Sequence, residues 1–539
     1  MKKNSYNATL LLASALVLIS SFNALSCFGQ EKRVVKQNPK LIIGIAVDQL
    51  RSDYIQALQN KLGEKGLKKL MNEGLVYENV TFDLDNIDAT AALAVLATGT
   101  YPFYNGVTSA SVYNQDMLRQ QSVFFDKQYI GNSTAGNYSP KALIGTNIAD
   151  ELKAASNNLS KVYSIAPNAE EAILAAGHTA DCAIWLDDKT GKWASTTYYR
   201  DFPQYVVRQN YDTPLFVDEK KATWTPVYSG GHIDIMPYCK ADLLPFTHTF
   251  VKDRRIAYPW IKTSPIINKA IVELSKQFIK QGRLGQSGTT DMLQLTLYAG
   301  TYQHLSVEES PSELQDIYVR LDQNIEELLS AVDGSVGLHN TIIYLTGTGN
   351  TDNCVSDLTE TVAGEFVGSR CTALLNSYLI SLYGQGSWVG SFDNNQIYLN
   401  HKTIEQKNLR LADVRHSAAE FVMMFSGVSE VVSANQILHE DSNARLTRLR
   451  NSYNKNFGGD LLVELQPGWQ FKADDASKPQ PQTRHDVAPG PAIIFAPGLI
   501  TPKHVTTPID ATEVSPTVAK TIRIRAPSGC KRIPLGFKN

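Results

Sequence analysis

The strongest constraint on the fold is residues 41–48, where the apolar run Leu-Ile-Ile-Gly-Ile-Ala-Val ends in one acid, Asp48. An uninterrupted apolar run of this length predicts a strand that is buried on both faces, as in the parallel sheets of α/β domains. Ligands of such domains bind at the carboxyl ends of the strands. We therefore expect Asp48 at the edge of the sheet where a functional site would form.

The rest of the sequence alternates predicted strands with predicted helices. A buried strand is predicted at 292–298, an amphipathic helix at 310–334 and another strand at 341–345. This alternation predicts an α/β domain with a doubly wound, mostly parallel sheet, spanning residues 38–539. Within it, residues 195–260 are rich in Tyr, Trp, Pro and Asp and have no helical period, so we expect an inserted cap lobe there.

Residues 1–30 have the pattern of an export signal. Two lysines after the initial Met precede an apolar segment, 10–19, that is too short to span a bilayer. Residues 24–27, Ala-Leu-Ser-Cys, form an imperfect lipobox, which would make Cys27 a lipidated amino terminus. Cleavage near Gly29 would instead give a soluble exported protein. Both alternatives place the protein in the periplasm or at the outer membrane.

The charge of the chain does not indicate a nucleic-acid partner. The 51 Lys and Arg residues stand against 53 Asp and Glu residues, for a net charge of −2. Proteins that bind nucleic acid usually carry an excess of positive charge. Apart from the export signal, no stretch of the sequence is long and apolar enough to cross a membrane, so we expect membrane contact only through a lipid on Cys27.

Residues 40–54 resemble the opening strand of the alkaline phosphatase superfamily. The similarity is closest to the type I phosphodiesterase / nucleotide pyrophosphatase branch and to the periplasmic phosphatases that use a single threonine. Further stretches match the same phosphatases, at 177–181, 185–191, 195–199, 318–322 and 465–469. The resemblance extends from about residue 40 almost to the end of the chain, and it implies an alkaline-phosphatase-like fold.

The resemblance also implies a reaction. Members of this family hold two zinc ions with Asp and His side chains and attack phosphorus with a Thr or Ser hydroxyl. Asp48 matches the first of the metal-ligating Asp residues. The nucleophile position falls on Ala89, whose side chain has no oxygen. Thr90, the next residue, is a weak alternative because its side chain would point about a third of a turn away on a helix.

Four other positions that the resemblance assigns to zinc ligands hold neutral residues. They are Thr301, Leu305, Thr348 and Gly349, with His304 one place from Leu305. A last ligand would come from His485. The positions assigned to a phosphate-binding Lys and Arg fall on Asn168 and Glu170, and the charge of Glu170 would repel a phosphate.

These substitutions favour a structural role for Asp48 over a role as a metal ligand. A lone carboxylate binds zinc poorly, and Asp is a favoured helix cap. We therefore expect Asp48 to cap the following helix or to accept a hydrogen bond from Thr301 or Thr348. His304 and His485 are weak candidates for metal ligands, since loop and surface histidines are the commoner case.

The leading hypothesis from the sequence is a pseudoenzyme. It would be a catalytically inactive binding or scaffold component of the bacterial cell envelope, without a cofactor and with an envelope or outer-membrane protein as its partner. The alternative is a metal-dependent phosphomonoesterase or phosphodiesterase that uses zinc in a rearranged site of Asp48, Thr90 and His485. The two hypotheses differ in whether the edge of the sheet keeps the charged groups that a reaction needs.

Overall fold

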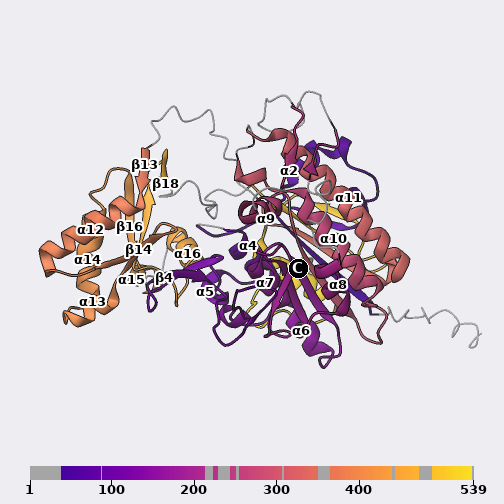
Figure 1. Ribbon diagram of the computed structural model, residues 1–539, viewed down its shortest axis with the longest axis horizontal. Helices are drawn as coiled ribbons and strands as arrows, with labels where there is room; N and C mark the ends of the chain where they lie inside the picture. The colour runs from indigo at the N-terminus through magenta and orange to yellow at the C-terminus, as the bar shows by residue number, and fades with distance from the viewer. Residues whose placement is uncertain are drawn as a thin grey trace, which may run out of the picture. The chain divides into compact units, whose positions relative to one another are not determined.

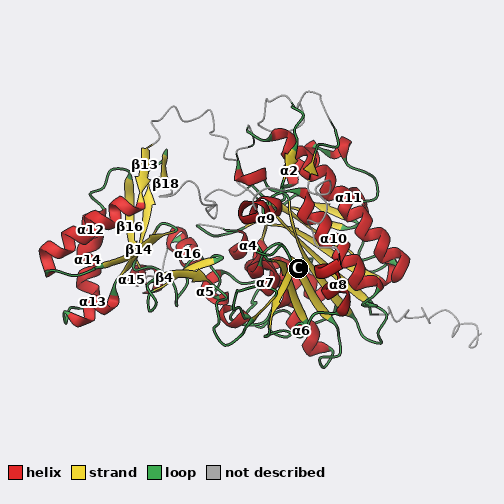
Figure 2. Cartoon of the chain, in the orientation of Figure 1, coloured by secondary structure: helices red, strands yellow, loops and turns green. Residues whose placement is uncertain are grey.

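The computed structural model describes residues 38–85, 88–212, 223–228, 243–250, 254–305, 307, 309–349, 364–439, 443–472 and 488–536. Its central feature is an 11-stranded sheet with the strand order β20-β2-β19-β12-β1-β11-β6-β7-β8-β5, in which β21 pairs with β2. Figure 1 labels the elements along the chain, and Figure 2 shows the strands of this sheet with helices around them.

Five neighbouring strands in the middle of the sheet run parallel to one another. They are β12 (Thr341–Gly347), β1 (Leu41–Asp48), β11 (Asp291–Tyr298), β6 (Val162–Ala166) and β7 (Cys182–Leu186). Almost all of their residues are buried, as the apolar run of β1 predicts. Antiparallel pairs extend the sheet on both sides, through β19 (Gly490–Phe495), β2 (Leu75–Thr81), β8 (Trp193–Thr196) and β5 (Gly131–Asn132).

Helices lie on both faces of the sheet. The Ser164 hydroxyl of β6 donates a hydrogen bond to the carbonyl of Ala172 (2.6 Å) in α7, whereas the ring of Tyr163 packs against Phe278 of α10. Since successive side chains of a strand point to opposite faces, α7 and α10 cover opposite sides. The main helices are α4 (Ala89–Thr98), α7 (Ala169–Ala176), α10 (Pro265–Lys280), α11 (Pro311–Ser335) and α17 (Val514–Thr521). The predicted doubly wound, mostly parallel sheet is confirmed.

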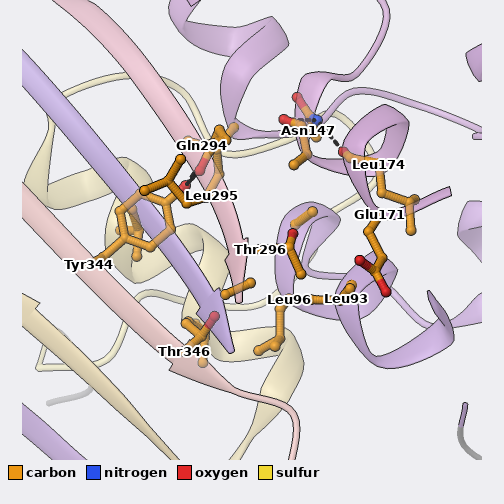
Figure 3. A pocket seen from close by; sticks show the side chains of 16 residues that line it. Leu93, Leu96, Asn147, Glu171, Leu174, Gln294, Leu295, Thr296, Tyr344 and Thr346 are labelled. Carbon is orange, nitrogen blue, oxygen red and sulfur yellow. Dashed lines mark hydrogen bonds between the residues drawn. The ribbon is translucent and has the colours of Figure 1, made fainter. Parts of the chain in front are cut away.

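Gly44 leaves room for a polar pair in the middle of β1. In the register of the sheet it lies between Gln294 and Tyr344. The Tyr344 hydroxyl donates a hydrogen bond of 2.8 Å to Gln294 Oε1, and Figure 3 shows the two side chains together. A Cβ on Gly44 would lie 1.8 Å from Gln294 Oε1 and 2.4 Å from the Tyr344 oxygen. This close approach requires glycine at the position.

The described part of residues 364–472 builds a second hydrophobic core around a sheet of its own. This four-stranded sheet has the order β14-β15-β17-β16, with β14 (Val389–Asp393), β15 (Gln396–Leu399), β16 (Val428–Ser433) and β17 (Leu461–Leu465). It packs with α12 (Gly368–Tyr383) and α14 (Leu411–Val422), and Trp388 is fully buried in its core. The sequence patterns above did not predict this core, because its strands are short and have no long apolar run.

Shorter elements connect these parts. The helices are α2 (Ser52–Ala57), α3 (Leu67–Glu73), α5 (Pro102–Asn105), α6 (Ile148–Ala155), α13 (His401–Gln406), α15 (Ala434–His439) and α16 (Ala444–Asn451). The strands are β3 (Ser111–Asn114), β4 (Arg119–Ser122), β13 (Gly364–Val367), β18 (Trp469–Lys472), β20 (Lys503–Val505) and β21 (Ile509–Asp510). β3 and β4 form an antiparallel hairpin, and β13 pairs with β18 in parallel.

The segment predicted as a cap lobe contains short elements with gaps in the description between them. They are α8 (Gln204–Asp212), β9 (Thr223–Trp224), β10 (His248–Thr249) and α9 (Arg254–Lys262), which leads into α10. Trp224 is buried, and its Nε1 donates a hydrogen bond of 2.6 Å to Asp316 of α11. That residues 195–260 form a lobe of their own stays a prediction.

None of the helices in the described ranges combines the length and apolar character that a membrane crossing needs. Residues 1–30, including Cys27, lie outside the described residues. The export signal and the two alternatives for its cleavage therefore stay predictions.

Candidate active site

Asp48 lies at the carboxyl end of β1, as the sequence predicts, and is 7% exposed. Its Oδ1 atom accepts a hydrogen bond of 2.9 Å from the hydroxyl of Thr348, which directly follows β12. The same hydroxyl accepts a hydrogen bond from the backbone N–H of Gln49 (2.9 Å). The expected hydrogen bond from Thr348 is thus present. The alternative cap role is wrong, because α2 has Arg51 at its N-cap and no side-chain cap.

Gln49 has an unusual backbone conformation beside Asp48. Its φ is 63°, in the left-handed region that residues other than glycine rarely adopt, and only 2% of its surface is exposed. Its Nε2 contacts Asp48 Oδ2 at 3.4 Å, whereas its Oε1 has no hydrogen-bond partner among the described residues. Backbone strain and unpaired buried polar atoms are typical of functional sites. Nothing in the sequence pattern singles out this residue.

The amino end of α4 carries the position assigned to the nucleophile. Asp88 caps this helix, since its carboxylate accepts hydrogen bonds from the backbone N–H groups of Ala91 (2.7 Å) and Ala110 (2.8 Å). Ala89 is the first residue of α4 and is partly exposed, whereas Thr90 is 4% exposed. The hydroxyl of Thr90 is therefore the one side-chain oxygen in the first turn of α4. The roles of both residues stay predictions.

The described residues do not fit a pair of zinc ions. Nowhere in the described ranges do three His, Cys, Asp or Glu side chains lie close enough together to share a metal. Thr301 is buried, and its carbonyl accepts a hydrogen bond of 2.7 Å from the Tyr298 hydroxyl. The ring of His304 lies 6.4 Å from that of Tyr298, and His485 falls outside the described residues.

Charged and polar side chains lie together at the ends of β6 and β7. Asn168, just before α7, donates hydrogen bonds to the Glu171 carboxyl from its backbone N–H (3.3 Å) and its Nδ2 (2.9 Å). Burial, with the negative charge of Asp48 as a further cause, raises the pKa of Glu171 to about 8. Glu171 is thus mostly protonated at neutral pH. The negative charge of Asp48 opposes ionisation of Glu171.

Lys262, the last residue of α9, contacts the charged and polar side chains at the ends of β6 and β7, although it lies far from them in the sequence. Its Nζ donates a hydrogen bond to Asn168 Oδ1 (3.0 Å) and forms an ion pair with Asp188 (2.7 Å). Glu170 accepts a hydrogen bond from the Ser122 hydroxyl (2.6 Å), and burial raises the pKa of its carboxyl group. The sequence carries no signal for this role of Lys262, because the residue belongs to no motif and lies far from its contacts along the chain.

A cavity of about 430 Å³ opens beside Lys262, lined by residues from 134–138, 168–170 and 185–189. This volume is in the range of small-molecule sites. A second cavity, of about 40 Å³, is lined by Glu171 of α7 and by Thr296 and Thr346 of the sheet, and Figure 3 shows these side chains around it. The second cavity has room for only a water molecule or two. Of the two, the cavity beside Lys262 is therefore the one that can admit a substrate.

Comparison with known proteins identifies the family. The model of the type I phosphodiesterase / nucleotide pyrophosphatase family matches residues 42–490. The chain belongs to this family. It is 30% identical over 522 residues to a protein named calcium-transporting ATPase from Myroides odoratus, covering 92% of this chain and 93% of that protein.

Two further relatives in this comparison are named alkaline phosphatases. PhoV of Synechococcus elongatus is 27% identical and covers 96% of this chain and 97% of its own length. PafA of Elizabethkingia meningoseptica is 25% identical and covers 94% of this chain and 96% of its own length. The crystal structure of wild-type PafA superposes with a TM-score of 0.78 at 24% identity, covering 93% of this chain and 98% of that one. This likeness confirms the alkaline-phosphatase-like fold.

The expectation of a pseudoenzyme is wrong. The relatives named alkaline phosphatase match this chain over almost its whole length, which points to a hydrolase. The expectation rests on the residues at the assigned nucleophile (Ala89), at the zinc-ligand positions such as Thr348 and Gly349, and at the phosphate-binding positions Asn168 and Glu170. The buried cation Lys262 beside Asn168 could not be counted from the sequence.

Proposed function

We propose that this protein is a phosphate-ester hydrolase whose reaction takes place at the carboxyl edge of the central sheet. The observation that carries the proposal is the placement of buried Asp48 and the cavity beside Lys262 at the ends of nearby parallel strands. Membership of a family with relatives named alkaline phosphatase supports this reaction. Phosphomonoesters and phosphodiesters are both candidate substrates.

The residues of this edge suit separate roles. Asp48, held by Thr348, supplies a fixed negative charge at the end of β1. We assign the nucleophile to Thr90, because Ala89 has no side-chain oxygen. Attack of the Thr90 oxygen on phosphorus forms a phosphothreonine and breaks the bond to the alcohol, which leaves with the hydroxyl proton. Water then attacks phosphorus of this intermediate and restores the Thr90 hydroxyl, which releases phosphate from a monoester or a phosphomonoester from a diester.

Zinc is the cofactor that the resemblance implies for such a reaction. Asp48 is the one carboxylate that the described residues keep at an assigned ligand position, and a single carboxylate does not make a zinc site. The assay for activity therefore has to be run both with zinc added and after chelation. Zinc content is measured on the same samples, so that turnover and metal are compared directly.

The test is hydrolysis of p-nitrophenyl phosphate and bis-p-nitrophenyl phosphate by the purified full-length protein. We expect turnover of at least one of the two esters. Thr90→Val keeps the shape of the buried side chain but removes its hydroxyl, and it should abolish turnover, whereas Thr90→Ser should retain part of it. Absence of hydrolysis of both esters, with and without zinc, would refute the proposal.

We further propose that the protein acts outside the cytoplasm, on the basis of the pattern in residues 1–30. Cell fractionation should find it in the periplasm or with the outer membrane. Labelling with a fatty acid, lost in Cys27→Ala, would identify the lipid anchor, whereas a mature chain that starts near Gln30 would identify simple cleavage. An envelope protein partner stays a proposal that co-purification in mild detergent can test.

A further inference from the structure

The cavity beside Lys262 supports an inference that rests on the proposed function and makes it more specific. We propose that Lys262 binds the negatively charged phosphoryl group of the substrate, and that Asp188 holds this lysine in position until the substrate enters. Lys262 would then be a substrate-binding residue supplied by α9, outside the strands that form the edge of the sheet.

Lys262 is buried more deeply than its ion pair explains. Its side chain is 9% exposed, whereas that of its partner Asp188 is 54% exposed. Removing an ammonium group from water is unfavourable unless its pairing compensates, and an ion pair with an exposed carboxylate is weak. Of the three N–H donors of the ammonium group, one is hydrogen-bonded to Asn168, and Asp188 forms an ion pair with the group. Within the described part of the chain these are its two polar partners, so Lys262 can still donate a hydrogen bond to a ligand.

The acidic groups around the cavity leave this positive charge available. Burial raises the pKa of both Glu170 and Glu171, so each carries less negative charge near neutral pH than an exposed glutamate does. Asp187 stays charged, but its Oδ1 already accepts hydrogen bonds from Lys189 and Thr190 in its own turn. Asp188 is the carboxylate that competes directly with an incoming anion for Lys262.

The placement of Lys262 also answers a question raised by the sequence. The positions that the resemblance assigns to a phosphate-binding Lys and Arg hold Asn168 and Glu170. Both line the cavity, and Lys262 is hydrogen-bonded to Asn168. Burial raises the pKa of Glu170, and the positive charge of Lys262 partly opposes this rise. A cation that comes from 94 residues further along the chain thus stands beside the two positions where the local sequence lacks one.

The test is the affinity of the full-length protein for inorganic phosphate, measured by titration calorimetry. We expect Lys262→Ala to weaken phosphate binding on the order of tenfold to a hundredfold, as expected for loss of a charged hydrogen bond. Lys262→Arg should retain most of the affinity. Asp188→Asn removes the competing carboxylate but keeps the cation, so it should bind phosphate as tightly as the wild type or more tightly.

A purely structural ion pair gives a different pattern. Lys262→Ala and Asp188→Asn would then lower the melting temperature to a similar extent, and both would bind phosphate alike. That result, or a wild-type protein that does not bind phosphate, would overturn the inference. If Lys262→Ala does not fold, the comparison of Asp188→Asn and Lys262→Arg with the wild type still decides: a loss of phosphate affinity in Asp188→Asn overturns it.

The inference and the proposed function can fail separately. Phosphate binding that depends on Lys262, in a protein that hydrolyses neither nitrophenyl ester, would support the inference and refute the proposed function. Hydrolysis with a KM that Lys262→Ala leaves unchanged would support the function and refute the inference. Measuring KM and kcat for the same variants therefore completes the experiment.

Discussion

The two halves of the sheet's carboxyl edge differ in charge. At the ends of β1 and β12, Asp48 is bonded to the neutral residues Thr348 and Gln49. At the ends of β6 and β7, the buried cation Lys262 contacts Asn168 and Asp188 beside a cavity. The comparison teaches that neutral residues in one half of an edge do not make the whole edge inert. The charges that a substrate meets can come from the other half.

The largest effect is expected from Asp48→Asn, which removes the charge of the β1 half. Loss of one fixed electrostatic group in an active site typically lowers the rate on the order of 100-fold. We expect kcat/KM for the better nitrophenyl ester to fall by that factor. Asp116→Asn, at an exposed position, is the matched control and should leave the rate unchanged. If Asp48→Asn is as active as the wild type, the chemistry lies entirely in the other half.

The next effect is the pH dependence of the free energy of unfolding that Glu171 should cause. The pKa of Glu171 is about 8 in the folded protein, above its ordinary value of 4.5, mainly because of burial. The unfolded chain therefore loses this proton at lower pH than the folded protein does. The free energy of unfolding should fall as the pH rises from about 4.5 to 8 and then level off, because ionisation over this range favours the unfolded state.

The side chain introduced by Glu171→Gln cannot ionise. Comparison of this variant with the wild type therefore isolates the contribution of Glu171 ionisation to the free energy of unfolding. Between pH 5 and pH 8.5, the wild type should lose about 1–3 kcal/mol of stability relative to Glu171→Gln, measured by urea unfolding. Circular dichroism at each pH gives the folded baseline. Parallel pH profiles for the two proteins would mean that Glu171 is ionised throughout and does not interact with Asp48.

A smaller effect is expected from Thr348→Val, which removes the hydroxyl that bonds to both Asp48 and Gln49. Loss of these buried hydrogen bonds should lower the free energy of unfolding by about 1–2 kcal/mol. Combined with Asp48→Asn, the two changes should be non-additive by at least about 0.5 kcal/mol, because the residues are in contact. Strict additivity in urea unfolding would show that the hydrogen bond contributes nothing to the folded state.

The smallest effect is expected from Lys189→Ala, an exposed lysine on the same cavity as Lys262. Exposed charges are screened by solvent and salt, so stability should change by less than about 0.5 kcal/mol and phosphate affinity by less than about threefold. Calorimetry on this variant serves as the control for Lys262→Ala. A loss of affinity as large as in Lys262→Ala would assign phosphate binding to the general positive charge of the cavity.

The sequence predicts those parts of the molecule that depend on local pattern. The apolar run at 41–48 predicts Asp48 at the edge of a parallel sheet, which is confirmed, and of the three alternatives for its carboxylate the hydrogen bond from Thr348 is the one present. The contact between Lys262 and Asn168 could not be predicted, because it depends on the path of a segment without periodicity. The conformation of Gln49 was equally hidden, since glutamine carries no preference for a left-handed backbone.

The glycine in the middle of β1 limits how this protein can be engineered. The Gln294–Tyr344 pair on the two flanking strands occupies the space that a side chain at position 44 would need. A substitution at one of the three positions therefore requires changes at the other two. A chimera that takes β1 from a relative with a bulkier residue at this position would also have to take the matching residues of β11 and β12 from that relative. In such a chimera, β1, β11 and β12 should therefore be exchanged together.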